Sequence, residues 1–353
     1  MKKSKCAIPA WGLLSLLGLI LATVIWSGPT AESQTTRPDT PDPTTERAVK
    51  FMFWNLENLF DTENDPENDG DDEYLPEKGW NDERYARKLA NLSEAIAAVE
   101  PHLLAVCEVE NARVLHDLAR TPKLKELGFK VAHRDTQDHR GIDLALLYRS
   151  PCELSGENAI TLHAMPDTRG ILEVAVKVKS QPLTVFVNHW PSRWGGVEKS
   201  EPRRLAVAKA LRQRVLEFEP EDDILILGDL NDEPFNRSVR QTLAAVRSRN
   251  AVLHRRNGEL LYNPMWRFFG KPDVGTYYYN RDWIWDLFDQ CIVSKGLLLE
   301  PGLRLDEESL AIHAPKSMRD DKQRPRWFRR KRGTDEWYEG YSDHFAIWGR
   351  LTW

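Results

Sequence analysis

Polar side chains of the kinds that bind metals and phosphates stand at the ends of several short apolar runs in this sequence. In the segment 225–234, LILGDLNDEP, Asp229 and Asn231 closely follow one such run. The other runs and their polar neighbours are FMFW before Asn55, LLAVC before Glu108, LTVFV before Asn188 and His189, CIV after Asp289, and FAIW after Asp343 and His344. A single case would mean little, because Asn and Asp are common in the turns that follow strands. Six cases together indicate that one edge of the fold collects these side chains.

The collected groups are carboxylates, amides and imidazoles, which suit chemistry on a phosphate ester. Hard oxygen ligands favour Mg²⁺, with Mn²⁺ or Ca²⁺ as alternatives, whereas zinc would favour more closely spaced His or Cys. A divalent ion neutralises charge on phosphoryl oxygens, and a His–Asp pair takes a proton from water. No Ser or Cys stands in a recognisable catalytic setting. We therefore expect metal-assisted hydrolysis of a phosphate ester.

The apolar runs have the length and the Val, Ile and aromatic content of β-strands. Two segments, 84–99 and 202–218, carry apolar residues at helical spacing instead. ILEVAVKV (171–178) followed by LTVFV (183–187) predicts a hairpin that turns at 180–182. Strands and helices mix without a regular βαβ alternation, which predicts a mixed α+β sheet protein. Because the polar group comes last in some runs and first in others, those strands must be antiparallel if all the groups meet at one rim.

Composition and charge limit the class of protein. The chain has 353 residues, 41% of them hydrophobic, which is enough for one large core or two modest ones. The formal net charge of -5 excludes a global positive field, so a site for a polyanion has to be local. Cys107 and Cys291 lie within apolar runs, and this placement favours buried thiols over a disulfide framework.

The first 47 residues differ in composition from the rest. A basic start is followed by an apolar run at 10–26, which predicts export to the periplasm or the cell exterior. Residues 1–29 are expected to be a signal peptide, and the alternative is an uncleaved anchor that holds the protein on the outward side of the inner membrane. Residues 30–47 are rich in Thr and Pro and predict a linker. The remainder, 48–353, is expected to be one catalytic domain.

Seven segments, in order along the chain, resemble motifs of the endonuclease/exonuclease/phosphatase superfamily, whose members include deoxyribonucleases and sphingomyelinases. The segments are FWNLENLFD, LLAVCEVEN, RGIDLALLYR, VNHWPSRWGG, LGDLNDEP, FDQCIVS and YSDHFAIW. The resemblance covers residues 48–353 and points especially to a bacterial exported subgroup. It implies a four-layered α/β sandwich, in which two mixed β-sheets pack face to face with helices on the outer faces.

The resemblance also implies roles for the polar residues at the strand ends. Glu108 would be the main metal ligand, with Asn55 and Asp343 beside it. Asp229 and Asn231 would orient the attacking water and hold the scissile phosphate.

The remaining expected site residues are histidines and substrate contacts. His344 would be a general base or a phosphate contact, oriented by Asp289, and His189 would assist the leaving group. The expected substrate contacts are Arg140, Arg193 and Trp190.

Each expected substrate contact has a structural alternative. Arg193 stands in a Gly-rich loop that suits a phosphate, with a purely structural loop as the alternative. Trp190 and Trp194 are expected either to stack on a base or to pack inside the protein. Asp143, three residues after Arg140, is expected either to line the cleft or to support a turn.

Residues 316–332 form a basic segment with nine Lys or Arg and two acids, interleaved with Trp327 and Phe328. The pattern predicts an arm for nucleic acid or anionic lipid, with a solvated loop as the alternative. Together with the motifs, it favours a monomeric endonuclease that acts on nucleic acid. The alternatives are a phosphoesterase for a lipid or small molecule and, from a different class, an inactive binding module.

Overall fold

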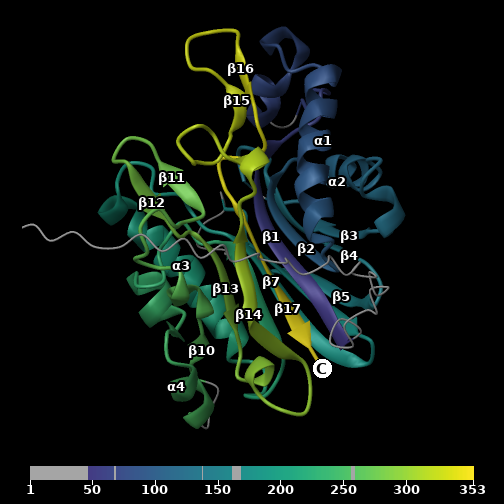
Figure 1. The fold of residues 1–353 in the computed structure, drawn as a ribbon. Coiled ribbons are helices and arrows are strands. Elements are labelled where there is room, and N and C mark those ends of the chain that lie inside the picture. Colours follow the sequence, from purple (N-terminus) through teal and green to yellow (C-terminus); the bar gives the residue numbers. More distant parts are fainter. Residues whose placement is uncertain (1–46, 67–68, 137, 161–167, 256–258) are drawn as a thin grey trace, which may run out of the picture. The chain divides into compact units, whose positions relative to one another are not determined.

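Two mixed β-sheets carry most of the strands in the computed structural model (Figure 1), which describes residues 47–66, 69–136, 138–160, 168–255 and 259–353. These residues belong to one unit, Pro43–Trp353. The predicted leader or anchor at 1–29 and all but the last residue of the predicted linker at 30–47 lie outside them. Within the described part of the chain, no helix is both long enough and apolar enough to cross a membrane.

The first sheet has six strands and the second has seven. In spatial order the first consists of β14 (Arg304–His313), β17 (Ala346–Thr352), β1 (Ala48–Leu59), β2 (Leu103–Val109), β4 (Asp143–Tyr148) and β3 (Lys130–Arg134). The second consists of β5 (Cys152–Ile160), β6 (Ile171–Val178), β7 (Gln181–His189), β8 (Ile224–Asp229), β13 (Asp289–Val293), β10 (Leu261–Tyr262) and β9 (Ala245–Val246). Two small hairpins are separate: β11 (Tyr277–Tyr279) with β12 (Ile284–Asp286), and β15 (Phe328–Arg330) with β16 (Trp337–Glu339).

Strand β1 shows why the apolar runs are continuous rather than alternating. Successive side chains of a strand point to opposite faces of the sheet. Phe51 and Phe53 are fully buried in the core between the two sheets, whereas Met52 and Trp54 are fully buried under the helices. A strand that is covered on both faces needs apolar residues at every position.

The described residues also form four α-helices: α1 (Asp82–Val99), α2 (Ala112–Ala119), α3 (Val197–Val215) and α4 (Arg249–His254). Buried residues of α1 and α2 pack on the outer face of the first sheet, and those of α3 pack on the outer face of the second (Figure 1). The core between the sheets forms a separate cluster. The expected four-layered sandwich is therefore confirmed.

The two predicted helices are present with shifted starts. Helix α1 begins at Asp82 because the side chain of Asn81 accepts a hydrogen bond from the backbone N–H of Arg84, which caps the first turn. Helix α3 begins at Val197, five residues before the predicted start, and contains Pro202. Proline lacks an N–H group and usually stands in the first turn, so its position suggested a later start than the chain adopts.

The predicted hairpin of β6 and β7 is also present, with a tighter turn than expected. Val178 pairs with Gln181, so the turn consists of Lys179 and Ser180, and Pro182 already belongs to β7. Lys179 has a φ of 56°, the left-handed conformation that a two-residue turn between antiparallel strands requires.

Candidate active site

Three strands of the second sheet bring polar residues to one level of its rim. β7 and β8 are parallel and place His189 beside Asp229 at their last residues. β13 runs antiparallel to β8 and places its first residue, Asp289, on the other side of Asp229. The approach of β7 to β8 requires glycine at position 228, because a Cβ atom there would lie 2.5 Å from the carbonyl oxygen of Asn188. The close spacing of β7 and β8 thus depends on the glycine that precedes Asp229.

The first sheet repeats this arrangement. β1 and β2 are parallel and carry Asn55 and Glu108 near their ends, and β17 is antiparallel to β1 and is preceded by Asp343 and His344. The reversal of strand direction expected from the sequence is therefore present in both sheets.

Asn55 connects the two sheets at the rim. Its Nδ2 donates hydrogen bonds to Oε1 of Glu108 at 3.3 Å and to Oδ2 of Asp229 at 3.2 Å. Its Oδ1 accepts the backbone N–H of Glu57 at 3.0 Å, which fixes the orientation of the amide. Asn55 therefore turns a nitrogen, not an oxygen, toward the carboxylates. This geometry lets Asn55 position Glu108 and Asp229, and its expected role as a metal ligand stays a prediction.

His344 and Asp289 form a buried pair. Nδ1 of His344 donates to Oδ2 of Asp289 at 2.7 Å, and Nε2 lies 3.7 Å from Oδ2 of Asp229. The ring of Tyr277 lies against the imidazole, with 4.8 Å between ring centroids. Burial alone would lower the pKa of His344, but Asp289 and Asp229 raise it well above its ordinary value. The pair thus holds a charged imidazole with Nε2 directed at Asp229.

Asp229 lies at the centre of the site. Its Oδ1 accepts the backbone N–H of Asn231 at 2.9 Å, and Asn231 adopts a left-handed φ of 48°. Burial raises the pKa of Asp229 to about 7, although His344 acts in the opposite direction. The carboxylate is therefore suited to exchange a proton with water near neutral pH.

His189 lies on the opposite side of Asp229 from Asp289. Its Nε2 is 3.6 Å from Oδ2 of Asp229 and 3.6 Å from Oε1 of Glu108. Burial, together with the positive charges of Arg169, Arg140 and His344, lowers its pKa well below the ordinary value. His189 is therefore a neutral imidazole, in contrast to His344.

Glu108 and Asp343 have the chemistry of a cation site. Both line the same cleft, and each is largely buried. Burial would raise the pKa of Glu108, but Arg140, Arg169 and His344 keep it below the ordinary value. The pKa of Asp343 is raised by burial and by the negative charge of Glu108, and no described residue donates a hydrogen bond to its carboxylate. Two carboxylates that repel each other at a cleft wall fit a divalent cation, which would remove the repulsion.

The cleft over these residues has a volume of about 1110 Å³. Arg140 enters it, with Nη2 3.9 Å from Oε1 of Glu108, as expected from the sequence. Arg169 also lines it and was not predicted. The sequence did contain a pattern that could have identified Arg169, because RGID at 140–143 and RGIL at 169–172 both place Arg-Gly before a strand. Both glycines have a left-handed φ.

Trp190 corrects the expectation of a substrate contact. The indole is fully buried in the core under α3, and its Nε1 donates to Oδ1 of Asn188 at 3.1 Å. Arg193 does line the cleft, but it also anchors its loop through a hydrogen bond from Nε to the carbonyl oxygen of Asn231 at 2.9 Å. Trp194, the next residue, is 87% exposed.

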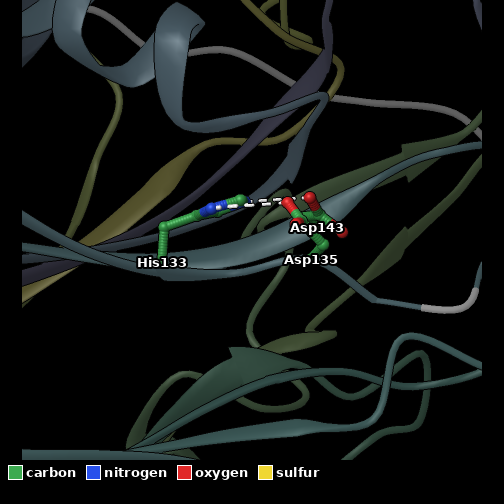
Figure 2. Close-up of side chains that lie close together, drawn as sticks. All are labelled: His133, Asp135 and Asp143. Atoms are coloured by element: carbon green, nitrogen blue, oxygen red, sulfur yellow. Dashed lines mark hydrogen bonds and ion pairs between the residues drawn. The ribbon is translucent and has the colours of Figure 1, made fainter. Parts of the chain in front are cut away.

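Asp143 supports a turn rather than the cleft. Its carboxylate accepts hydrogen bonds from Nε2 of His133 at 2.8 Å and from the backbone N–H of Thr136 at 2.7 Å. Figure 2 shows His133 directed toward Asp143 and Asp135 at this turn.

The basic segment 316–332 is folded in part as strand β15 and is held by local contacts. Arg330 pairs with Asp335 at 2.5 Å and Lys331 with Glu336 at 2.7 Å. The backbone N–H of Phe328 donates to the buried carboxylate of Glu57 at 2.6 Å. The segment is thus not a wholly solvated loop, and its binding to nucleic acid stays a prediction.

A four-layered sandwich with a His–Asp pair and clustered carboxylates at one rim defines a class of hydrolases that act on phosphoester bonds. The chain belongs to the endonuclease/exonuclease/phosphatase family, whose sequence profile matches residues 50–352. No curated protein matches the chain in sequence.

Solved structures share the fold at low sequence identity. TDP2 from D. rerio, in a complex with a single-strand DNA product, is 14% identical with a TM-score of 0.55, and the match covers 87% of this chain and 99% of that one. A mannosyl-6-phosphatase from Bacteroides thetaiotaomicron is 13% identical with a TM-score of 0.55, and the match covers 86% of this chain and 100% of that one. Since both identities are low, the likeness establishes the fold and leaves the substrate open.

Proposed function

We propose that the protein is an exported, divalent-metal-dependent phosphodiesterase that cleaves nucleic acid. The observation that carries the proposal is the cleft of about 1110 Å³, which places a carboxylate centre among the cationic side chains of Arg140, Arg169, Arg193 and Arg281. Cations around the reacting phosphate suit a substrate with several phosphates, and carboxylates at the centre suit a metal ion. Export rests on the composition of residues 1–29 alone.

Different residues of the site have different roles in the proposed reaction. A divalent cation held by Glu108 and Asp343 would supply neutralisation of charge on the phosphoryl oxygens. Asp229 orients a water molecule and accepts its proton, and Asn55 keeps that carboxylate in place. His344, held through Nδ1 by Asp289, has Nε2 3.7 Å from Oδ2 of Asp229, where it would contact the phosphate. His189, on the other side of Asp229, lies where it can assist the leaving oxygen.

A second candidate is a phosphoesterase that acts on lipid. The hairpin β11–β12 contributes Tyr279 and Ile284 to the cleft, and Ile284 and the neighbouring Trp283 are exposed large apolar side chains. Exposed apolar side chains beside a cleft are typical of contacts with membranes or other apolar partners.

The test measures product release from supercoiled plasmid DNA, structured RNA, sphingomyelin vesicles and mannose 6-phosphate. Each substrate is incubated with the full-length chain in Mg²⁺, in Mn²⁺ and in EDTA, and Asp229→Ala serves as the blank. Metal-dependent cleavage of plasmid or RNA that the blank lacks would support the proposal. Intact nucleic acid with hydrolysis of sphingomyelin or of the sugar phosphate would refute it and leave the phosphoesterase class in place.

A further inference from the structure

A second pocket opens beside the active-site cleft. It has a volume of about 480 Å³ and shares Arg140, Arg169, His189, Ser192 and Trp194 with the cleft. Because the two spaces have a common wall, one extended ligand can occupy both. We refer to this second space as the side pocket.

The side pocket is basic, whereas the centre of the cleft is acidic. Among the described residues that line it, Asp138 is the one acidic side chain, and its carboxylate lies 3.1 Å from Nε of Arg169 and 3.6 Å from Nε of Arg140. A third arginine, Arg203, reaches the pocket from α3, is exposed and has no carboxylate partner among the residues that the structure describes. Arg140 also lies 3.9 Å from Glu108 in the cleft, so among the described residues three guanidinium groups face two carboxylates, and the remaining positive charge favours an anion.

The ligand that this charge favours is a phosphate group. Guanidinium groups bind phosphate oxygens through two parallel hydrogen bonds, and a pocket wall formed by three of them offers several such donors. A metal ion does not suit the side pocket, because one carboxylate that is already shared by two arginines cannot hold it.

Trp194 stands at the boundary between the two spaces. Its indole is 87% exposed and has no ring partner in the described part of the chain. The preceding residue, Arg193, is fixed by Asn231 and by Asn236 at 3.0 Å, so the backbone that carries the indole is anchored. An exposed, anchored aromatic face is a surface on which a nucleobase stacks.

We propose that the side pocket binds a second phosphate of a nucleic acid strand, next to the scissile one, while Trp194 stacks on the intervening base. The proposal rests on the proposed function, since it assigns a subsite to that reaction. It names Arg203 as a specificity residue that never reaches the reacting phosphate. The consequence is a preference for substrates that carry a phosphate beyond the scissile one.

The experiment compares three substrates with the full-length chain in Mg²⁺ or Mn²⁺. They are thymidine dinucleotides with a single internal phosphodiester: one without a terminal phosphate, one with a 5′ phosphate and one with a 3′ phosphate. The wild-type chain is expected to have a KM about tenfold lower for one of the phosphorylated forms, which corresponds to ~1.4 kcal/mol. Arg203→Ala should abolish this preference and leave the kcat and KM for the unphosphorylated dinucleotide unchanged.

Two further variants separate the pocket from general charge and from folding. Lys209→Ala removes another exposed cation from α3 that does not line the pocket, and it should keep the preference. Trp194→Ala should raise the KM for all three dinucleotides by roughly 5- to 100-fold through lost stacking, with an unchanged thermal melt because the indole is exposed. A wild-type chain without the preference, or an Arg203→Ala variant that keeps it, would overturn the subsite. If the chain cleaves plasmid DNA but none of the three dinucleotides, the subsite is overturned and the proposed function stands; if plasmid DNA and RNA also stay intact, the proposed function itself is contradicted.

Discussion

Among the residues that the structure describes, two regions contain a histidine with two nearby carboxylates, and one of the two has the setting of an active site. At the rim, His344 lies 2.7 Å from Asp289 and 3.7 Å from Asp229. At the turn after β3, His133 lies 2.8 Å from Asp143 and 3.8 Å from Asp135 (Figure 2). The residue types and the His–Asp distances alone do not distinguish the two clusters.

The difference lies in how the backbone supplies the groups. The rim cluster combines the last residue of β8 and the first residue of β13 with His344, which precedes β17, so both sheets contribute to it, and it faces the large cleft. The turn cluster comes from one pair of neighbouring strands. The second carboxylate oxygen of Asp143 accepts a hydrogen bond from the backbone N–H of Thr136. Residues that converge from separate strands onto a cleft indicate chemistry, whereas those that converge within one turn indicate local stability.

The largest effect should come from the imidazole of the rim. His344→Gln is expected to lower kcat by about 10²–10⁴-fold, because the variant loses the group that faces Asp229 and the phosphate. The thermal melt followed by circular dichroism should stay close to that of the wild type. A variant that keeps more than half of the wild-type kcat would remove His344 from the site.

A smaller effect should follow from changing the cation site. Glu108→Gln is expected to raise the Mg²⁺ concentration for half-maximal activity by at least about tenfold, because a charged oxygen ligand becomes a neutral amide. The measurement is activity against metal concentration. Asp135→Asn is the matched control in the turn cluster and should leave the titration unchanged; an unchanged titration for Glu108→Gln would refute its role.

The smallest effect on activity should come from the turn. Asp143→Asn is expected to leave kcat within about twofold of the wild type and to lower the free energy of unfolding by about 1–3 kcal/mol, because a buried charge-assisted hydrogen bond to His133 is weakened. Urea unfolding with linear extrapolation gives the stability. Unchanged stability together with a large loss of kcat would reverse the assignment of the two clusters.

The sequence predicted the rim well because each of its polar residues borders a strand-length apolar run. A residue at the end of a strand lies at the edge of the sheet. The sequence therefore predicted that Glu108, Asp229 and Asp289 lie at one edge. It could not predict side-chain direction. The backbone N–H of Trp190 donates to the carbonyl oxygen of Asp229, and the indole lies in the core. The backbone N–H of Glu57 donates to Oδ1 of Asn55, so that Nδ2 of Asn55 faces the carboxylates.

Individual side-chain contacts were also beyond the sequence. Arg169 carries the same Arg-Gly signal as Arg140, but the sequence does not show that its guanidinium donates to the carbonyl oxygen of Trp190 at 3.0 Å. The charge excess of 316–332 was visible, but its pairing with Asp335 and Glu336, just beyond the segment, depends on the fold of the β15–β16 hairpin.

The most direct measurement changes one equivalent atom in each cluster. Asp289 and Asp143 are both buried, and each accepts a hydrogen bond from a histidine, so Asp289→Asn and Asp143→Asn are the same chemical change. The kcat of both variants is measured on one phosphodiester that the wild-type chain cleaves. We predict that Asp289→Asn lowers kcat by at least about 100-fold and that Asp143→Asn keeps it near the wild-type value. Equal losses in the two variants, or a greater loss in Asp143→Asn, would contradict the placement of the active site at the rim.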